Sequence, residues 1–294
     1  MNRITSAAEL RQCVAGWRRA GQRVAFVPTM GGIHRGHTRL VEIAADQADR
    51  VITSVFVNPT QFDQRADFER YPRQLERDAE PLQAAGCDLL FAPAVDTLYP
   101  LGLDLRAWVD VERGAAQLEG AHRPGHFRGV ATVVTKLLNL VLPDIALFGE
   151  KDYEQLLVVR LLVRELLLPV EIAAVPTVRE ADGLALSSRN AHLDAAEREQ
   201  APALYRTLQW AAAKVAGDTA RAGSVEVQAK ARLAQAGFRV DYFRFCNAEL
   251  APASDPEQEW RVLAAAWLGA TRLIDNLGFR PADGPPAWGT AGQG

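Results

Sequence analysis

The first half of the chain alternates between short apolar runs and longer segments with apolar residues at helical spacing. The apolar runs are typical of buried strands and lie at residues 23–28, 51–57, 87–93, 145–148 and 170–175. The periodic segments predict helices at residues 37–48, 72–85, 129–141 and 153–167, after a first helix that ends near residue 20 and starts at a capping box of Ser6 and Glu9. Strands separated by helices predict a parallel α/β sheet with right-handed crossovers.

The second half has a different pattern, with two predicted helices at residues 195–216 and 224–236. Three strand-like stretches, RVDYFRFCN, RVLAAAWL and TRLIDN, then follow one another with little helix between them. We therefore expect a large α/β domain at residues 1–178 and a smaller α+β domain at residues 179–280. The tail, residues 281–294, is rich in Gly and Pro and is expected to be disordered.

Composition places the chain among globular proteins, with 294 residues that are 48% hydrophobic and 23% charged. The net charge of -3 gives no indication of a nucleic-acid or membrane surface. A membrane-spanning helix requires an apolar stretch of about 18 residues, and the sequence contains none. The first residues also lack the apolar core of a signal peptide. We expect a cytoplasmic protein. Its three cysteines are far apart in the sequence and form no CxxC motif, so neither a disulfide framework nor a cysteine zinc site is indicated.

The stretch VPTMGGIHRGH, residues 27–37, places His34 and His37 around the start of a helix that follows the first strand. In a parallel sheet such turns lie where ligands bind, and a helix N-terminus favours an anion. Imidazoles at this position can donate to phosphate oxygens. Two alternatives stay open here: ordinary helix residues, or a metal site, which is weakened because no third ligand is suitably spaced nearby. Neither common glycine-rich nucleotide motif is present, so a nucleotide would be bound by another device.

The stretch SVFVNPTQF carries two amides, Asn58 and Gln61, at the carboxyl end of the second strand. They could bind a small polar substrate, although Asn-Pro also simply begins a turn. In LFGEKDYEQL, Lys151 stands at a helix start, where the helix dipole disfavours a cation. A bound polyphosphate would explain this position, and Asp152 and Gln155 would lie near it; the alternative is a solvated first turn.

Two further stretches are rich in donors. In DGLALSSRN, two hydroxyls and a guanidinium, from Ser187, Ser188 and Arg189, could wrap a phosphate. In EGAHRPGHFRG, a basic cluster precedes a predicted helix and could meet an acidic substrate or form a surface loop; its members are His122, Arg123, His126 and Arg128. No serine-hydrolase motif is found.

Taken together and in this order, these stretches resemble one family, the pantoate–β-alanine ligases. The resemblance covers about residues 1–280 and also takes in RYPRQLERD, PDIALFGEKDYEQL and AAWLGATRLIDN. It departs from the family at Gly32, where Ala or Asn is commoner, and at Ile33, where Leu is usual. The resemblance implies a Rossmann-like N-terminal domain of the HxGH nucleotidyltransferase group, related in fold to class I aminoacyl-tRNA synthetases, and a homodimer.

The resemblance also implies a set of site residues. Those expected to bind ATP are Met30, Gly31, Gly32, Ile33, His34, Arg35, Gly36 and His37, with Gly149, Glu150, Lys151, Asp152, Val178, Leu186, Ser187, Ser188 and Arg189. His37, His34 and Lys151 are the implied catalytic residues. Gln61 and Gln155 would hold pantoate, with Asn58 and Tyr71 in the same pocket, and Asp78 and Asp152 would lie near Mg²⁺.

The implied reaction has two steps: pantoate attacks the α-phosphorus of ATP to give pantoyl adenylate, and β-alanine then converts the adenylate to pantothenate and AMP. The carboxylate nucleophile is already an anion at neutral pH, so it needs donors that relieve charge repulsion, and no base. The smaller domain would act as a lid over the adenylate. The alternatives are another HxGH nucleotidyltransferase, disfavoured by the neutral amides of Gln61 and Gln155, and a non-catalytic nucleotide-binding module.

Overall fold

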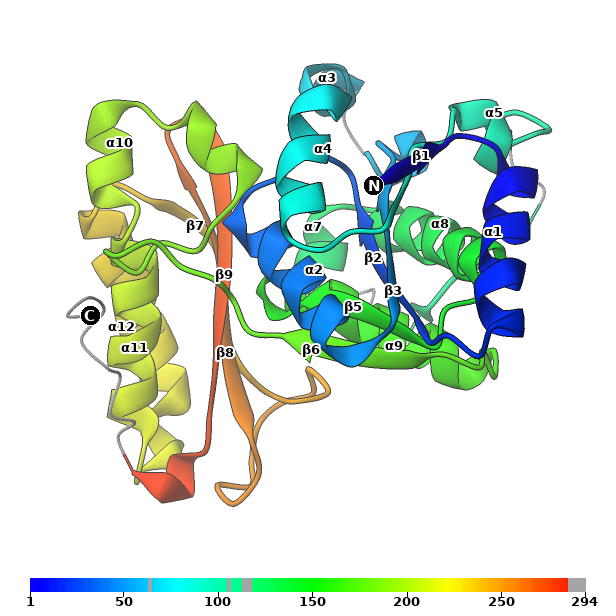
Figure 1. Cartoon of the computed structure of the whole chain (residues 1–294). Coiled ribbons are helices and arrows are strands. Elements are labelled where there is room, and N and C mark those ends of the chain that lie inside the picture. Colours follow the sequence, from blue (N-terminus) through cyan, green and yellow to red (C-terminus); the bar gives the residue numbers. More distant parts are fainter. Residues whose placement is uncertain (63–64, 105–106, 113–117, 285–294) are drawn as a thin grey trace. The chain divides into compact units, whose positions relative to one another are not determined.

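The computed structural model describes residues 1–62, 65–104, 107–112 and 118–284 (Figure 1). The chain divides into two compact units: Met1–Glu150 with Glu154–Pro176, and Lys151–Tyr153 with Thr177–Gly294. Each has its own sheet and its own apolar core. The lid function expected of residues 179–280 stays a prediction. Of the tail expected to be disordered, residues 281–284 contain the turn η5 (Pro281–Asp283), and residues 285–294 lie outside the described chain.

The first unit contains a six-stranded sheet whose recorded strand pairs are all parallel, as the sequence predicts. Its strands, in spatial order, are β1 (Asn2–Ile4), β4 (Leu89–Phe91), β3 (Arg50–Val55), β2 (Val24–Thr29), β5 (Ile145–Gly149) and β6 (Glu171–Val175). Strand β1 is an addition to the predicted set. With three residues, it is too short to show a hydrophobic period.

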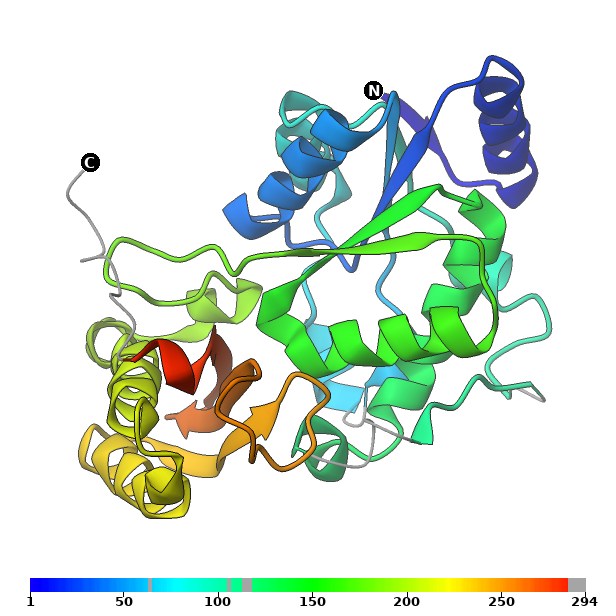
Figure 2. The same cartoon turned by 90° about the horizontal axis from the view of Figure 1, so that it is seen from below.

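Helices pack on both faces of this sheet (Figure 2). The long ones are α1 (Ala7–Arg19), α2 (Arg35–Gln47), α4 (Leu75–Ala84), α8 (His126–Val141) and α9 (Tyr153–Glu165). Along β2, Ala25 and Val27 join the core beneath α2 and α4. Val24 and Phe26 alternate with them and therefore face the opposite side, where α1 and α8 contact β2 and each other. The shorter helices are α3 (Arg65–Arg70), α5 (Val95–Leu98) and α7 (Leu118–His122), and the 3₁₀ turns are η1 (Pro59–Gln61) and η2 (Glu150–Asp152).

The order of the strands creates a switch point at β2. The chain moves from β2 to β3 on one side, whereas β5 lies on the other side of β2. In open parallel sheets, ligands bind outside the carboxyl ends of the strands at such a point. Strand β2 leads there into Met30, and β5 ends there at Gly149.

The second unit has a three-stranded antiparallel sheet in the order β7 (Arg239–Asn247), β8 (Trp260–Leu268), β9 (Thr271–Phe279). Its apolar core joins this sheet to α11 (Ala203–Val215) and α12 (Ala222–Gln235). The single helix predicted over residues 195–216 is wrong, because α10 (Ala195–Gln200) ends before α11 begins. Pro202 stands at the N-cap of α11, since a proline cannot donate the hydrogen bond that a continuous helix needs. The remaining turns are η3 (Ser188–His192) and η4 (Thr219–Arg221).

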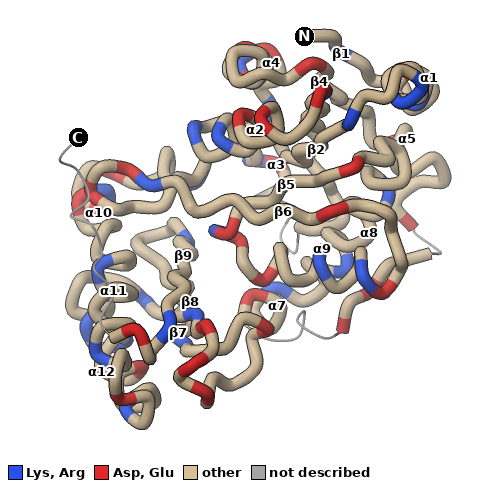
Figure 3. Tube along the Cα trace, turned by 60° about the horizontal axis from the view of Figure 1, so that its bottom comes forward, with Lys and Arg blue, Asp and Glu red and all other residues tan. Residues whose placement is uncertain are grey.

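Acidic and basic residues are interspersed along both units (Figure 3). Within the described ranges, no helix is long and apolar enough to cross a membrane.

Candidate active site

The turn that follows β2 is held in place by a buried carboxylate. The two oxygens of Asp78, on α4, accept the backbone N–H groups of Gly32 at 3.2 Å and Ile33 at 2.9 Å. Gly31 has φ +85°, and a Cβ atom there would lie 2.9 Å from the Asp78 carboxylate. The tight turn therefore depends on glycine at this position, where a side chain would both strain the backbone and displace Asp78.

His34 and His37 cap the helix that this turn leads into. His34 is the N-cap residue of α2, and its Nδ1 atom accepts the backbone N–H of Gly36 at 3.1 Å. The backbone N–H of His34 in turn donates to Nδ1 of His37 at 3.3 Å. The two rings lie 4.1 Å apart between centroids, at an interplanar angle of 37°.

This capping arrangement determines which ring nitrogen can donate. A neutral imidazole has one donor and one acceptor nitrogen. Because Nδ1 accepts in both His34 and His37, the proton of each neutral ring is on Nε2. The N-terminus of α2 thus presents two imidazole Nε2–H donors together with the positive end of the helix dipole, which suits a phosphate group.

Asn58 and Gln61, the two predicted amides, meet at a buried point beyond β3. Asn58 Nδ2 donates to Gln61 Oε1 at 2.9 Å and to the carbonyl of Gly129 at 3.2 Å. Gln61 Nε2 donates to the sulfur of Met30 at 3.1 Å, and an amide nitrogen has a second N–H group that can donate to a ligand. The structure therefore brings three predicted site residues together, with an amide donor suited to a carboxylate or hydroxyl oxygen.

Tyr99 orients this pair, and the sequence analysis did not identify it. Its hydroxyl donates to Asn58 Oδ1 at 2.7 Å and lies 3.2 Å from the Thr60 hydroxyl. Burial raises the pKa of Tyr99 above its ordinary value, against the opposing effect of the hydrogen bond with Thr60, so the phenol keeps its proton and can donate. No local motif marks Tyr99, because it is 41 positions from Asn58.

His126 supports the same pocket from α8. It is buried, and its Nδ1 atom lies 2.8 Å from the carbonyl oxygen of Gln61. Arg128 instead stacks on Trp108, with its guanidinium carbon 4.5 Å from the ring centroid. Within the basic cluster predicted at residues 122–128, Arg123 Nη1 lies 3.3 Å from His126 Nε2, whereas His122 and Arg128 are exposed. Contact of this cluster with an acidic substrate stays a prediction.

Two other residues expected near pantoate, Tyr71 and Gln155, are both half-buried. Tyr71 packs edge-on against Phe62, with ring centroids 5.7 Å apart. Gln155 lies in the first turn of α9 and, among the described residues, makes no hydrogen bond with Gln61 or Asn58. Their assignment to the pantoate pocket stays a prediction.

In the second unit, Lys151 lies in η2, directly after β5 and Gly149. Its side chain is 17% exposed, and its ammonium nitrogen is 4.0 Å from an oxygen of Asp152, whose side chain is 50% exposed. The carbonyl of Lys151 accepts a hydrogen bond from Asn276 at 2.9 Å. Lysine and aspartate thus offer one cation and one accessible carboxylate side by side.

The predicted Ser187–Arg189 segment follows a tight hairpin of the second unit. Leu186 N–H donates to the carbonyl of Val178 at 3.0 Å, which closes this hairpin. Ser187 is the N-cap of η3, and its hydroxyl accepts the backbone N–H of Arg189 at 3.3 Å. Ser188 is half-buried, like the residues on either side of it.

The two candidate magnesium ligands fit that ion differently. Asp78 is 4% exposed, and both its oxygens already accept backbone N–H groups, so its clearest function is to hold the turn. Asp152 is accessible and could share an ion with phosphate oxygens, which is the way Mg²⁺ commonly binds. Among the described residues, no group of three or more His, Cys, Asp or Glu side chains could hold a metal.

Comparisons with known proteins agree on one family. The family model of pantoate-beta-alanine ligase matches residues 2–278. The pantothenate synthetase of Pseudomonas putida is 51% identical over 278 residues, 94% of this chain and 97% of that protein. A crystal structure of pantothenate synthetase from Thermus thermophilus is 49% identical, with a TM-score of 0.86 over 94% of this chain and 99% of that one. A pantoate-beta-alanine ligase structure from Francisella tularensis, complexed with beta-gamma ATP and beta-alanine, is 33% identical, with a TM-score of 0.78 over 97% and 100% of the chains.

Proposed function

Because the chain belongs to the pantoate–β-alanine ligase family and condenses pantoate with β-alanine at the expense of ATP, we propose that the reaction runs in two steps through pantoyl adenylate. A pantoate carboxylate oxygen attacks the α-phosphorus of ATP, and the bond to pyrophosphate breaks. The amine of β-alanine then attacks the acyl carbon, which releases AMP and gives pantothenate. The observation that carries this proposal is the pair of capping histidines at the N-terminus of α2, whose Nδ1 atoms both accept backbone N–H groups and thereby leave the proton of each neutral ring on Nε2.

The charges in the first step explain why donors outnumber bases among these residues. Pantoate is ionised at neutral pH, since carboxyl groups titrate near pH 4. Its approach to a triphosphate needs neutralisation, and negative charge builds up on the departing pyrophosphate. One preorganised donor at developing charge contributes about 3–4 kcal/mol. We assign this function to His34, His37, Lys151 and Arg189, with the N-terminus of α2.

Pantoate would be bound by Gln61, because its Nε2 atom is the amide donor that Asn58 leaves available. A neutral amide donor can bind either the carboxylate or a hydroxyl group of a hydroxy acid. It cannot bind a cationic group, which has no acceptor. Tyr71 and Gln155 complete the proposed pocket.

Magnesium is proposed as the ion that accompanies ATP, with Asp152 as the residue that would hold it. When bound, it supplies positive charge to the phosphate oxygens. We also propose that the chain forms a homodimer, which analytical ultracentrifugation would test, and the cytoplasmic location stays a prediction.

The two-step scheme is tested by isotope exchange. With pantoate, Mg-ATP and no β-alanine, labelled pyrophosphate should enter ATP, because the adenylate forms reversibly before the amine is needed. Omitting pantoate should abolish the exchange. An enzyme that releases AMP with all substrates present but shows no exchange without β-alanine would contradict the adenylate step, although not the overall reaction.

A further inference from the structure

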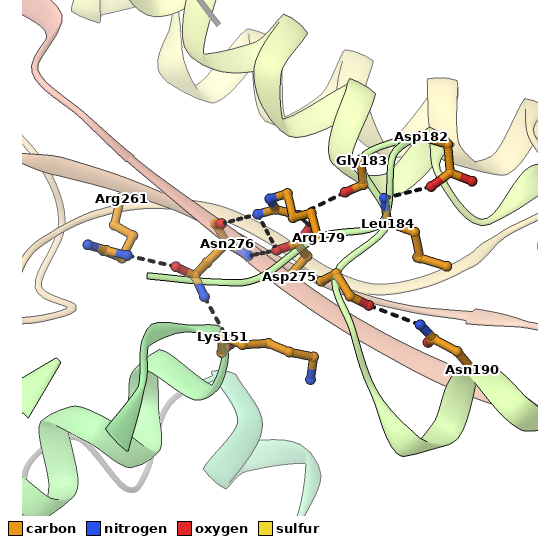
Figure 4. Close-up of polar contacts among 10 residues, drawn as sticks. Lys151, Arg179, Asp182, Gly183, Leu184, Asn190, Arg261, Asp275 and Asn276 are labelled. Carbon is orange, nitrogen blue, oxygen red and sulfur yellow. Dashed lines mark hydrogen bonds and ion pairs between the residues drawn. The ribbon is translucent and has the colours of Figure 1, made fainter. Parts of the chain in front are cut away.

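The middle of strand β9 carries two buried polar residues that the proposed function does not use. Asp275 and Asn276, the last residues of the TRLIDN stretch, are 4% and 5% exposed. Burying polar groups is costly unless they are hydrogen-bonded, so their partners indicate what they do. Figure 4 shows that the two side chains reach different segments of the second unit.

Asn276 holds the backbone of Lys151. Its Nδ2 atom donates to the Lys151 carbonyl at 2.9 Å, and its Oδ1 atom accepts from Arg261 at 2.7 Å. Because the arginine can only donate, it fixes which end of the amide faces Lys151. Asparagine is therefore needed here as a donor and an acceptor at once.

The same contacts continue along the segment that carries the lysine. The guanidinium of Arg261 stacks on the ring of Tyr153 at 3.8 Å, and the Tyr153 hydroxyl donates to the carbonyl of Ala248 at 2.9 Å. These contacts explain why Lys151–Tyr153 group with the second unit, although the residues before and after them belong to the first.

Asp275 holds the hairpin that leads to Ser187–Arg189. Its carboxylate forms a two-bond ion pair with Arg179, at 2.6 and 2.9 Å. Arg179 also donates to the carbonyl of Gly183 at 3.1 Å and pairs with Ala185 across the hairpin. A bidentate pair fixes orientation as well as distance, so the hairpin is tied to β9 beside the point where Asn276 holds Lys151 (Figure 4).

We propose that Asn276 is a positioning residue for Lys151, and that Asp275, its neighbour on β9, positions the Ser187–Arg189 segment through Arg179. Two adjacent residues of β9 thus set the spacing of the two cationic donor groups in the second unit. The inference rests on the proposed function, which assigns Lys151 and Arg189 to the phosphates of ATP. Misplacing a reacting group by about 1 Å can cost about 100-fold in rate, so such an anchor affects turnover without touching substrate.

The test compares Asn276→Asp in two backgrounds, the whole chain and its Lys151→Ala variant. Aspartate keeps the shape of the side chain and the acceptor for Arg261 but cannot donate to the Lys151 carbonyl. We expect kcat for AMP release to fall about 10- to 100-fold, while KM for pantoate stays within twofold. In the Lys151→Ala background, the same change should lower the residual kcat by less than about twofold, because the group it positions is gone.

The matched control is Asn247→Asp, the same chemical change in the same unit. Within the described part of the chain, the Asn247 side chain forms hydrogen bonds only through its Oδ1 atom, which accepts from the N–H groups of Glu249 and Ala251, and aspartate keeps both bonds. We expect its kcat to be unchanged. If thermal melting shows that Asn276→Asp does not fold, Asn276→Ala removes the same donor without burying a charge and takes its place.

The possible failures are distinguishable. Near-normal turnover of Lys151→Ala would overturn the proposed function of that lysine and the inference with it. An inactive Lys151→Ala enzyme beside a fully active Asn276→Asp enzyme would overturn the inference alone. An equal loss of kcat in both backgrounds would mean that Asn276 acts on the fold in general, which also overturns it.

Discussion

Replacing Tyr99 by phenylalanine should weaken pantoate binding, although no contact between Tyr99 and pantoate is proposed. The ring is 2% exposed, and its hydroxyl donates to Asn58 Oδ1 at 2.7 Å. Asn58 then donates to Gln61 Oε1, which leaves Gln61 Nε2 as the donor for substrate. The substitution removes only the hydroxyl, since the ammonium of Lys136, 4.8 Å from the ring centroid, can contact a phenyl face as well.

The expected size of the effect follows from the bonds that remain. One neutral hydrogen bond contributes about 0.5–1.5 kcal/mol net. Asn58 Oδ1 keeps a second donor, because the Thr60 hydroxyl lies 3.0 Å away, so no buried acceptor is left without a partner. A loss of about 1 kcal/mol corresponds to a rise of about fivefold in KM for pantoate. KM for ATP should not change.

The assay measures initial rates of AMP release with pantoate varied and the other substrates saturating. The decisive comparison is Tyr99→Phe in the wild-type and Gln61→Ala backgrounds, because a residue that acts through Gln61 has no further effect once that side chain is removed. Tyr242→Phe, on β7 in the second unit, is the control for loss of a buried tyrosine hydroxyl. A fivefold effect that persists in the Gln61→Ala enzyme, or an equal rise in KM for ATP, would refute the reasoning.

Three further predictions concern the same unit. His34→Asn should keep the cap on α2, since Asn is a good N-cap residue, yet lower kcat by orders of magnitude, as His37→Ala should; normal turnover with unchanged thermal stability would contradict the phosphate role. Gly129→Ala would place a methyl group 2.3 Å from a backbone carbonyl oxygen, so urea unfolding should show a loss of about 1–3 kcal/mol, whereas Gly223→Ala, whose methyl group would meet no described atom outside its own helix within 4 Å, should not lower the free energy of unfolding. Because burial raises the pKa of Tyr99 above 10.0, its contribution to stability is present below that pH and is lost as the pH rises through the folded-state pKa. The difference in unfolding free energy between wild type and Tyr99→Phe should therefore shrink as the pH rises above 10.0, and a constant difference would argue against a buried, protonated phenol.

Hydrophobic spacing was sufficient to predict the long elements of the fold, because each spans enough positions to show its period. Strand β1 and helix α3 were not predicted, because their sequences, NRI and RADFER, contain no run of apolar residues. The break between α10 and α11 could have been predicted, because Pro202 lies inside the apolar pattern and removes a helical donor. The helical spacing of the apolar residues on both sides of Pro202 led to the prediction of one continuous helix, although the proline itself argued against it.

The residues of the candidate site also fall into two groups, those that a short sequence motif reveals and those that are distant in the sequence from the residues they orient. His34 and His37 lie three positions apart, and Asn58 lies three from Gln61, so a motif shows both pairs. The residues that orient them do not share a motif with them: Asn276 lies 125 positions from Lys151. Such partners come together only through the pairing of strands and the packing of helices, and no spacing in the sequence encodes that distance.

The spacing of the two histidines has two explanations, a helix start and a phosphate site, and these use different atoms of the same rings. Nδ1 of His34 and Nδ1 of His37 accept backbone N–H groups, as capping side chains do. That use places the proton of each neutral ring on Nε2, the nitrogen that a phosphate needs as a donor. Capping therefore does not compete with phosphate binding but selects the tautomer for it. Aspartate would cap α2 as well, yet an ionised carboxylate has no donor, and serine accepts and donates at one and the same oxygen. Histidine places the acceptor on Nδ1 and the donor on Nε2, so its use here serves the ligand as well as the helix.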